Sequence, residues 1–224
     1  MSRLRRDESG FTLIELLVTL AIGMVVMAAI LGLLDLSVRG SANSLGRQQA
    51  VRDARSAADR IGQELRLASC PATGTAIISA TDDSVSYYVS RPQSDYRLAP
   101  VVERHTLTYS ATGGTVTLTV SPGTGTPPTW TATPSRQTVL AQGLSRTGTS
   151  PIFEYRGYDS PTDLATTAIA APVGAAALRS IGQVRLTFTA LAAYPNATQG
   201  SSRFQSTIAL RTDDPSDQDN TPEC

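Results

Sequence analysis

A carboxylate at the edge of a long apolar run is the side chain in this sequence that most needs a chemical explanation. Glu15 is followed by 19 consecutive uncharged residues, Leu16 to Leu34. A charged group inside lipid costs about 3 kcal/mol or more, so such a residue is by default functional and tolerable only with a partner. We therefore predict that Glu15 has a partner in the state in which the protein works.

Little else in the composition suggests chemistry. The chain has 224 residues, and its 19 arginines balance 19 acidic residues with no lysine present. This neutrality argues against nucleic-acid binding through phosphate neutralisation. His105 is the single histidine, and there is no nucleophile elbow, phosphate-binding glycine loop or Cys/His ligand cluster. We expect neither an enzyme nor a protein that binds nucleic acid directly.

The element that carries Glu15 is predicted to be a membrane-spanning helix over residues 11–36. Nineteen residues at about 1.5 Å each cross most of a hydrocarbon core of about 30 Å. Three arginines precede the run and Asp35 follows it, which places the N-terminus in the cytoplasm: Arg3, Arg5 and Arg6. A secretory signal peptide could use residues 26–28 as a loose cleavage site, but the apolar core of such a peptide is shorter than this run. A plain signal anchor fits the length but leaves Glu15 unexplained.

The segment Gly10-Phe11-Thr12-Leu13-Ile14-Glu15 resembles the processing site of type IV prepilins and pseudopilins. The resemblance implies that a prepilin peptidase cuts after Gly10, whose missing side chain suits a narrow site, and then methylates the new amino group of Phe11. It also implies that Glu15 meets the amino terminus of a neighbouring subunit during assembly. The alternative for Glu15 is a side chain that reaches back to the cytoplasmic headgroups.

The family resemblance divides the chain into a cleaved leader (1–10), a transmembrane and assembly helix (11–36), an amphipathic half of the helix (37–70), a β-rich head (71–211) and an acidic tail (212–224). Residues 37–46 are poor helix formers, and we expect the helix to weaken or bend there. An apolar stripe then recurs at helical spacing: Val51, Ala54, Ala58, Ile61, Leu65 and Ala68. We expect Arg55–Asp59 and Arg60–Glu64 ion pairs, and a helix end at Ser69–Cys70 before Pro71.

Alternating patterns beyond Pro71 predict strands, so the fold class is α+β, a long helix on an antiparallel sheet. A hairpin with a turn at 111–114 should pair Leu107 and Tyr109 with valines and a leucine of the next strand. Trp130 lies in a predicted loop at 123–134, capping the sheet. Residues 165–181 are expected to be a loop with one short helix. The predicted strands are 75–80, 84–90, 105–109, 115–120, 152–156, 184–190 and a last one marked by Phe204, Ile208 and Leu210.

The segments 57–66 and 151–159, and the pair 181–190 and 204–211, resemble the J-type pseudopilins of type II secretion and the W-type minor pilins. This favours a minor subunit of a pilus or pseudopilus, placed at a tip or initiation complex. The implied partners are prepilin peptidase, other pilin or pseudopilin subunits, an inner-membrane assembly platform and lipid, with the head outside the cytoplasmic membrane. The alternative is a membrane-anchored binding module or adhesin that never enters a filament.

The two cysteines, Cys70 and Cys224, lie outside the membrane in this topology, where a disulfide between them is allowed. Two free thiols, or a Cys224 pair between subunits, are the alternatives. Some pseudopilins bind calcium through C-terminal carboxylates, but the five acidic residues of the tail match no calcium loop. We expect a solvated tail and no cofactor, with calcium at the tail as the alternative.

Overall fold

A single long helix leads into a β-rich region in the computed structural model. The structure describes residues 12–70, 75–92, 100–124, 128–131, 133–157, 167–190 and 201–210. Two compact units are present, residues 1–45 and 46–224. The predicted leader, the acidic tail, Gly10, Phe11 and Cys224 lie outside the described residues.

Helix α1 (Leu13–Leu65) is continuous, so the expected weakening at residues 37–46 is wrong. Each poor helix former costs at most about 1 kcal/mol, and a helix that is already nucleated on both sides propagates through them. The helix also ends before the predicted Ser69–Cys70. Its last turn tightens, because the amides of Leu67 and Ala68 bond the carbonyls three residues back, both at 3.1 Å.

The first sheet contains six antiparallel strands. Their order is β1-β2-β3-β4-β5, and β6 also pairs with β4. The predicted hairpin is confirmed, since Leu107 pairs with Leu118 and Tyr109 with Val116. Sequence patterns missed β6, and β5 lies inside the segment expected to be a loop. The strands are β1 (Ile77–Ala80), β2 (Ser84–Arg91), β3 (Val101–Ser110), β4 (Thr115–Thr124), β5 (Thr129–Trp130) and β6 (Arg136–Ala141).

A second antiparallel sheet has the order β11-β10-β8-β9, with β7 paired to β10. The expectation of a single sheet is therefore wrong in number, although every pairing is antiparallel as expected. The predicted loop at 165–181 contains β9 and a short 3₁₀ helix, η1 (Ala177–Ser180). The strands are β7 (Leu144–Ser145), β8 (Phe153–Gly157), β9 (Thr167–Ile169), β10 (Ile181–Ala190) and β11 (Ser202–Ala209).

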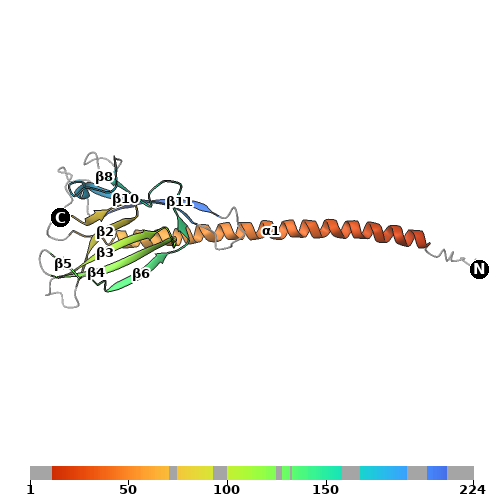
Figure 1. The fold of residues 1–224 in the computed structure, drawn as a ribbon, viewed down its shortest axis with the longest axis horizontal. Helices are drawn as coiled ribbons and strands as arrows, with labels where there is room; N and C mark the ends of the chain where they lie inside the picture. Colours follow the sequence, from red (N-terminus) through yellow and green to blue (C-terminus); the bar gives the residue numbers. More distant parts are fainter. Residues whose placement is uncertain are drawn as a thin grey trace, which may run out of the picture. The chain divides into compact units, whose positions relative to one another are not determined.

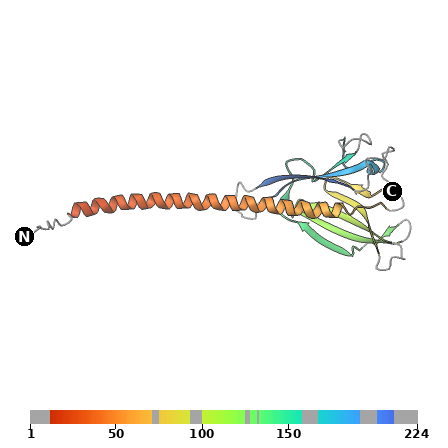
Figure 2. The same ribbon diagram turned by 180° about the vertical axis from the view of Figure 1, so that it is seen from behind.

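The last part of α1 packs against both sheets. Figures 1 and 2 show it with β3, β4 and β6 on one side and β10 and β11 on the other. The predicted stripe is confirmed at five of its six positions, because Ala54, Ala58, Ile61, Leu65 and Ala68 are all buried, whereas Val51 is half-buried. The five buried residues belong to one core cluster that also contains residues of both sheets. The small alanines let the helix lie close to the strands.

The turn between β1 and β2 joins the two sheets. The hydroxyl of Tyr155, on β8, donates to the carbonyl oxygens of Thr81 at 2.7 Å and Ser84 at 3.0 Å. The amides of Ile152 and Phe153 both bond the carbonyl of Asp82 at 3.1 Å. These bonds satisfy buried polar groups where the core passes from one sheet to the other.

Trp130 caps the first sheet, as expected. Its ring centroid lies 5.5 Å from that of Tyr88 and 5.4 Å from the guanidinium carbon of Arg104. A Cβ on Gly123 would lie only 2.7 Å from the Trp130 ring, so glycine is needed for this approach. The tryptophan therefore has a structural role in the half-buried edge of the sheet.

Replacing Ile61 by alanine tests the helix–sheet packing. Ile61 is 0% exposed, and removing three buried carbons should lower the free energy of unfolding by about 2–4 kcal/mol. Leu67→Ala is the matched control, because Leu67 is 47% exposed and its truncation leaves no cavity. Urea unfolding of the full chain in detergent measures both. Equal losses in the two variants would contradict the packing described here.

Candidate functional site

The first described residues build a helix N-terminus directly after the predicted cleavage point. Thr12 precedes Leu13, where α1 begins. The amide of Glu15 bonds the Thr12 hydroxyl oxygen at 3.4 Å and its carbonyl oxygen at 3.1 Å. This is the geometry of an N-cap residue, with an acidic residue three positions later. Sequence reasoning missed this cap, although the Thr12–Glu15 spacing is its recognised signal.

Glu15 is an exposed side chain in the first turn of α1. A carboxylate there interacts favourably with the positive end of the helix dipole. Within the described residues no cationic side chain approaches it. The predicted partner for Glu15 therefore has to come from outside the part of the chain that the structure describes.

The surface that follows Glu15 is apolar and uncovered. Large side chains from Leu13 to Leu36 are roughly half to four-fifths exposed, and no part of the most apolar window is buried. The segment from Leu13 to Leu36 is about 36 Å long at 1.5 Å per residue. By length and composition α1 qualifies as a membrane-crossing helix. Asp35 and Arg39 close the apolar run with an exposed ion pair of 2.8 Å.

Gly23 and Gly32 present open backbone on this surface. Apart from the neighbouring backbone of α1, a Cβ at either position would have no atom of the described residues within 4 Å. Packing within the described part of the chain therefore does not require either glycine. Small residues of this kind let a second helix approach closely.

A second group of charged residues lies in the β-rich unit, and sequence reasoning missed it. His105, on β3, is 0% exposed. Its Nδ1 lies 3.3 Å from Oε2 of Glu64 on α1, and its Nε2 lies 3.1 Å from Oε2 of Glu103. The Nε of Arg91 bonds the same Glu103 oxygen at 2.8 Å. No local spacing signals this cluster, because Glu64 and His105 are 41 residues apart.

The expected helix ion pairs are therefore wrong. Glu64 contacts His105 in place of Arg60, and Arg60 donates to the carbonyl of Leu140 on β6 at 3.4 Å. Arg55 and Asp59 form no ion pair within the described residues. A buried imidazole is a better partner for Glu64 than an exposed arginine, because water screens the exposed charge.

Cys70 follows α1 and is half-buried at the edge of the core. It is not a free cysteine in the structure. Cys224 lies outside the described residues. The Cys70–Cys224 disulfide stays a prediction.

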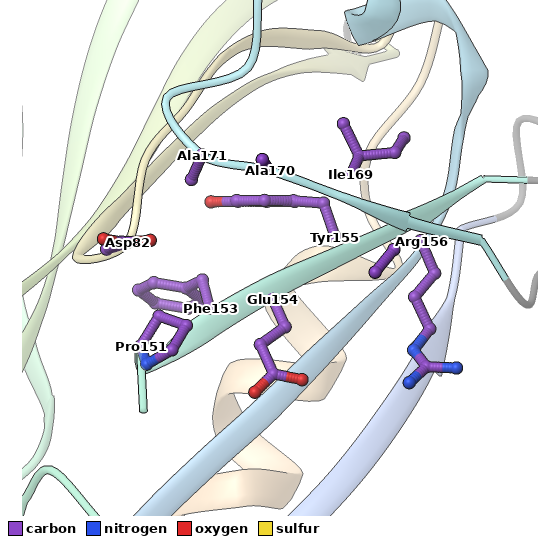
Figure 3. A pocket seen from close by; sticks show the side chains of 10 residues that line it. Asp82, Pro151, Phe153, Glu154, Tyr155, Arg156, Ile169, Ala170 and Ala171 are labelled. Carbon is purple, nitrogen blue, oxygen red and sulfur yellow. The ribbon is translucent and has the colours of Figure 1, made fainter. Parts of the chain in front are cut away.

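One cavity of about 250 Å³ opens between β8 and the segment after β9 (Figure 3). Tyr155 points into it, toward Ala170 and Ala171, whereas Glu154 and Arg156 point away from the Tyr155 ring. The Tyr155 hydroxyl is already bonded to two carbonyls. Among the described residues no three metal-ligating side chains converge.

Replacing Glu64 by glutamine tests the buried cluster at acid pH. The hydrogen bond and charge of His105 hold the pKa of Glu64 below its usual 4.5 against the opposing effect of burial, with Arg136 and Arg91 adding to the lowering. A carboxyl whose folded pKa is depressed stabilises the fold above its unfolded pKa, and this contribution is lost as the pH falls through the folded pKa. Wild-type unfolding should therefore become easier below about pH 4.5, more steeply than in Glu64→Gln.

The matched control for this measurement is Asp59→Asn, on the exposed side of the same helix. Thermal unfolding of the three proteins between pH 3 and 7 gives the slopes. At neutral pH, Glu64→Gln should lose about 1–3 kcal/mol of stability, and Asp59→Asn less than about 0.5 kcal/mol. Parallel acid slopes in wild type and Glu64→Gln would rule out an ionised, bonded Glu64.

Comparison with known proteins agrees with the N-terminal geometry. Residues 5–31 match the family described as the prokaryotic N-terminal methylation motif. No curated protein matches the chain. The matched segment contains Arg5 and Arg6, the Gly10–Phe11 pair, the Thr12 cap, Glu15 and most of the exposed apolar surface. With this motif leading an apolar helix and an antiparallel β-rich head, the chain belongs to the type IV prepilin and pseudopilin family.

Proposed function

We propose that this protein is a minor pilin or pseudopilin, a structural subunit without enzymatic activity that enters a type IV pilus or a type II secretion pseudopilus. The observation that carries the proposal is the methylation motif placed directly on a capped helix whose apolar first half is exposed. Such a helix can be covered by lipid before assembly and by neighbouring helices afterwards. A subunit of a filament needs both states.

The proposed maturation creates the partner that Glu15 lacks. Cleavage after Gly10 leaves a methylated ammonium on Phe11, one residue before the Thr12 cap. The ammonium then lies four residues before Glu15 in the sequence. In a filament with a fixed stagger, the ammonium of one subunit meets Glu15 of the next. A paired carboxylate is tolerable in an apolar bundle, whereas an unpaired one is costly.

The charge pattern around the span supports an orientation. Arg3, Arg5 and Arg6 precede the apolar run, and the exposed Asp35–Arg39 pair follows it. We place the N-terminus in the cytoplasm and the β-rich head outside. The partners in this proposal are prepilin peptidase, other pilin-type subunits and an inner-membrane assembly platform.

A place at the tip or in an initiation complex is supported by the head. The segments that resemble J-type pseudopilins and W-type minor pilins form the end of α1, strand β8 and the β10–β11 pair. Residues 181–190 and 202–209 pair over eight positions, as the resemblance implies for a closing hairpin. The pairing of Gly123 on β4 with Trp130 on β5 belongs to the first sheet, in a part of the chain that lies outside these segments.

Mass spectrometry of the mature N-terminus tests the maturation. In membrane and sheared-filament fractions we expect a peptide that begins at N-methylated Phe11. Gly10→Val should abolish this peptide, because a branched side chain does not fit where glycine is needed. A wild-type protein whose N-terminus is still Met1 or Ser2 would contradict the proposal and favour a membrane-anchored binding module.

Replacing Glu15 by glutamine tests assembly separately from maturation. The change keeps the size of the side chain and removes its charge, so cleavage should persist. The amount of the protein in the sheared filament fraction should fall at least about tenfold, since an interaction of roughly 1.4 kcal/mol or more is lost. Asp35→Asn is the control, because Asp35 already has Arg39 as its partner. Equal filament incorporation of both variants would contradict the role of Glu15.

A further inference from the structure

The cluster around His105 connects two elements that lie far apart in the sequence. Glu64 belongs to the last turns of α1, whereas Glu103 and His105 belong to β3. The imidazole is 0% exposed, so water does not complete its hydrogen bonds. Both ring nitrogens face a carboxylate oxygen, at 3.3 Å for Glu64 and 3.1 Å for Glu103.

This geometry restricts how the protons can be arranged. An ionised carboxylate only accepts hydrogen bonds, and a neutral imidazole has one donor and one acceptor nitrogen. A neutral His105 would point a lone pair at one of the two carboxylates in a place that excludes water. With a proton on each nitrogen, the ring donates to both.

We propose that His105 is a doubly protonated clamp that fastens the end of α1 to the first sheet, and that losing one imidazole proton releases this clamp. The device is independent of whether the chain enters a filament. It makes the stability of the head sensitive to pH on both sides. Acid removes the charge of the carboxylates, and alkali removes the charge of the ring.

The positive and negative charges of the cluster are equal in number only when the His105 ring is charged. Glu64 and Glu103 carry two negative charges, and His105 with Arg91 carries two positive ones. Arg136 on β6 adds a favourable field at Glu64. Loss of the imidazole proton leaves two carboxylates against one contacting guanidinium, and a partly buried unbalanced charge is strongly destabilising.

Tyr87 lies beside the His105 ring. Its ring centroid, on β2, is 5.7 Å from that of His105. Its hydroxyl is buried without a hydrogen-bond partner among the described residues, and burial together with the Glu64 charge raises its pKa well above 10.0. Tyr87 therefore stays neutral and supplies no charge to replace the lost proton.

His105 is the only histidine of the chain, which makes the test direct. The full-length protein, purified in detergent without a histidine tag, is labelled with ¹⁵N-histidine. At neutral pH we expect two-bond proton–nitrogen spectra in which both ring nitrogens carry a proton. A spectrum with one protonated and one unprotonated nitrogen would overturn the proposal. This experiment uses only the wild-type protein, so it does not depend on whether a variant folds.

Titration of variants tests the two carboxylates. Glu64→Gln and Glu103→Gln should each weaken proton binding by His105 about tenfold or more, because each removes one charge in contact with the ring. Asp59→Asn, which lies outside the cluster, should leave proton binding unchanged. His105→Gln should lower the Tm by about 5–10 °C and abolish the loss of stability on the alkaline side. The same titration midpoint in all variants would show that the carboxylates do not hold the proton.

Discussion

An apolar helix surface that none of the described residues covers is the constraint on which the rest of the structure depends. From Leu13 to Leu36 the large side chains of α1 are exposed, and Glu15 has no cationic partner among the described residues. The apolar surface is unfavourable in water, and the unpaired carboxylate of Glu15 is unfavourable in lipid. Lipid followed by a bundle of like helices satisfies each in turn, which is the behaviour proposed for a member of the type IV prepilin and pseudopilin family.

The β-rich unit has to hold the other half of the same helix firmly. Alanines bring α1 close to the strands, and Ile61 and Leu65 are the largest α1 side chains buried in a core shared with both sheets. Tyr155 joins the sheets at the β1–β2 turn, and the Glu64–His105–Glu103 cluster adds polar bonds between α1 and β3. Apolar packing supplies most of the stability, whereas the polar bonds fix which strand the helix end faces.

Local patterns predicted the parts of this structure that local physics determines. The stripe from Ala54 to Ala68 follows helical periodicity, and the β3–β4 register follows from alternation and a short turn. The motif around Gly10 and Glu15 was recognisable because its residues are contiguous. The continuity of α1 through residues 37–46 was missed because cooperativity outweighs single-residue propensity. Strands β7 and β9 were missed because they are only two and three residues long, and β6 was missed because most of its residues are exposed and its burial does not alternate. The partnership of Glu64 with His105 was missed because the two residues are 41 positions apart.

The central claim is that one surface of α1 is covered by lipid before maturation and by other subunits afterwards. Site-specific photo-crosslinking from Val25, in the middle of the exposed span, tests this in intact cells. The account predicts adducts with other subunits that carry the methylation motif when Gly10 is present, and adducts with lipid alone when Gly10 is replaced by valine. The same adducts in both proteins, or lipid adducts alone in both, would contradict it.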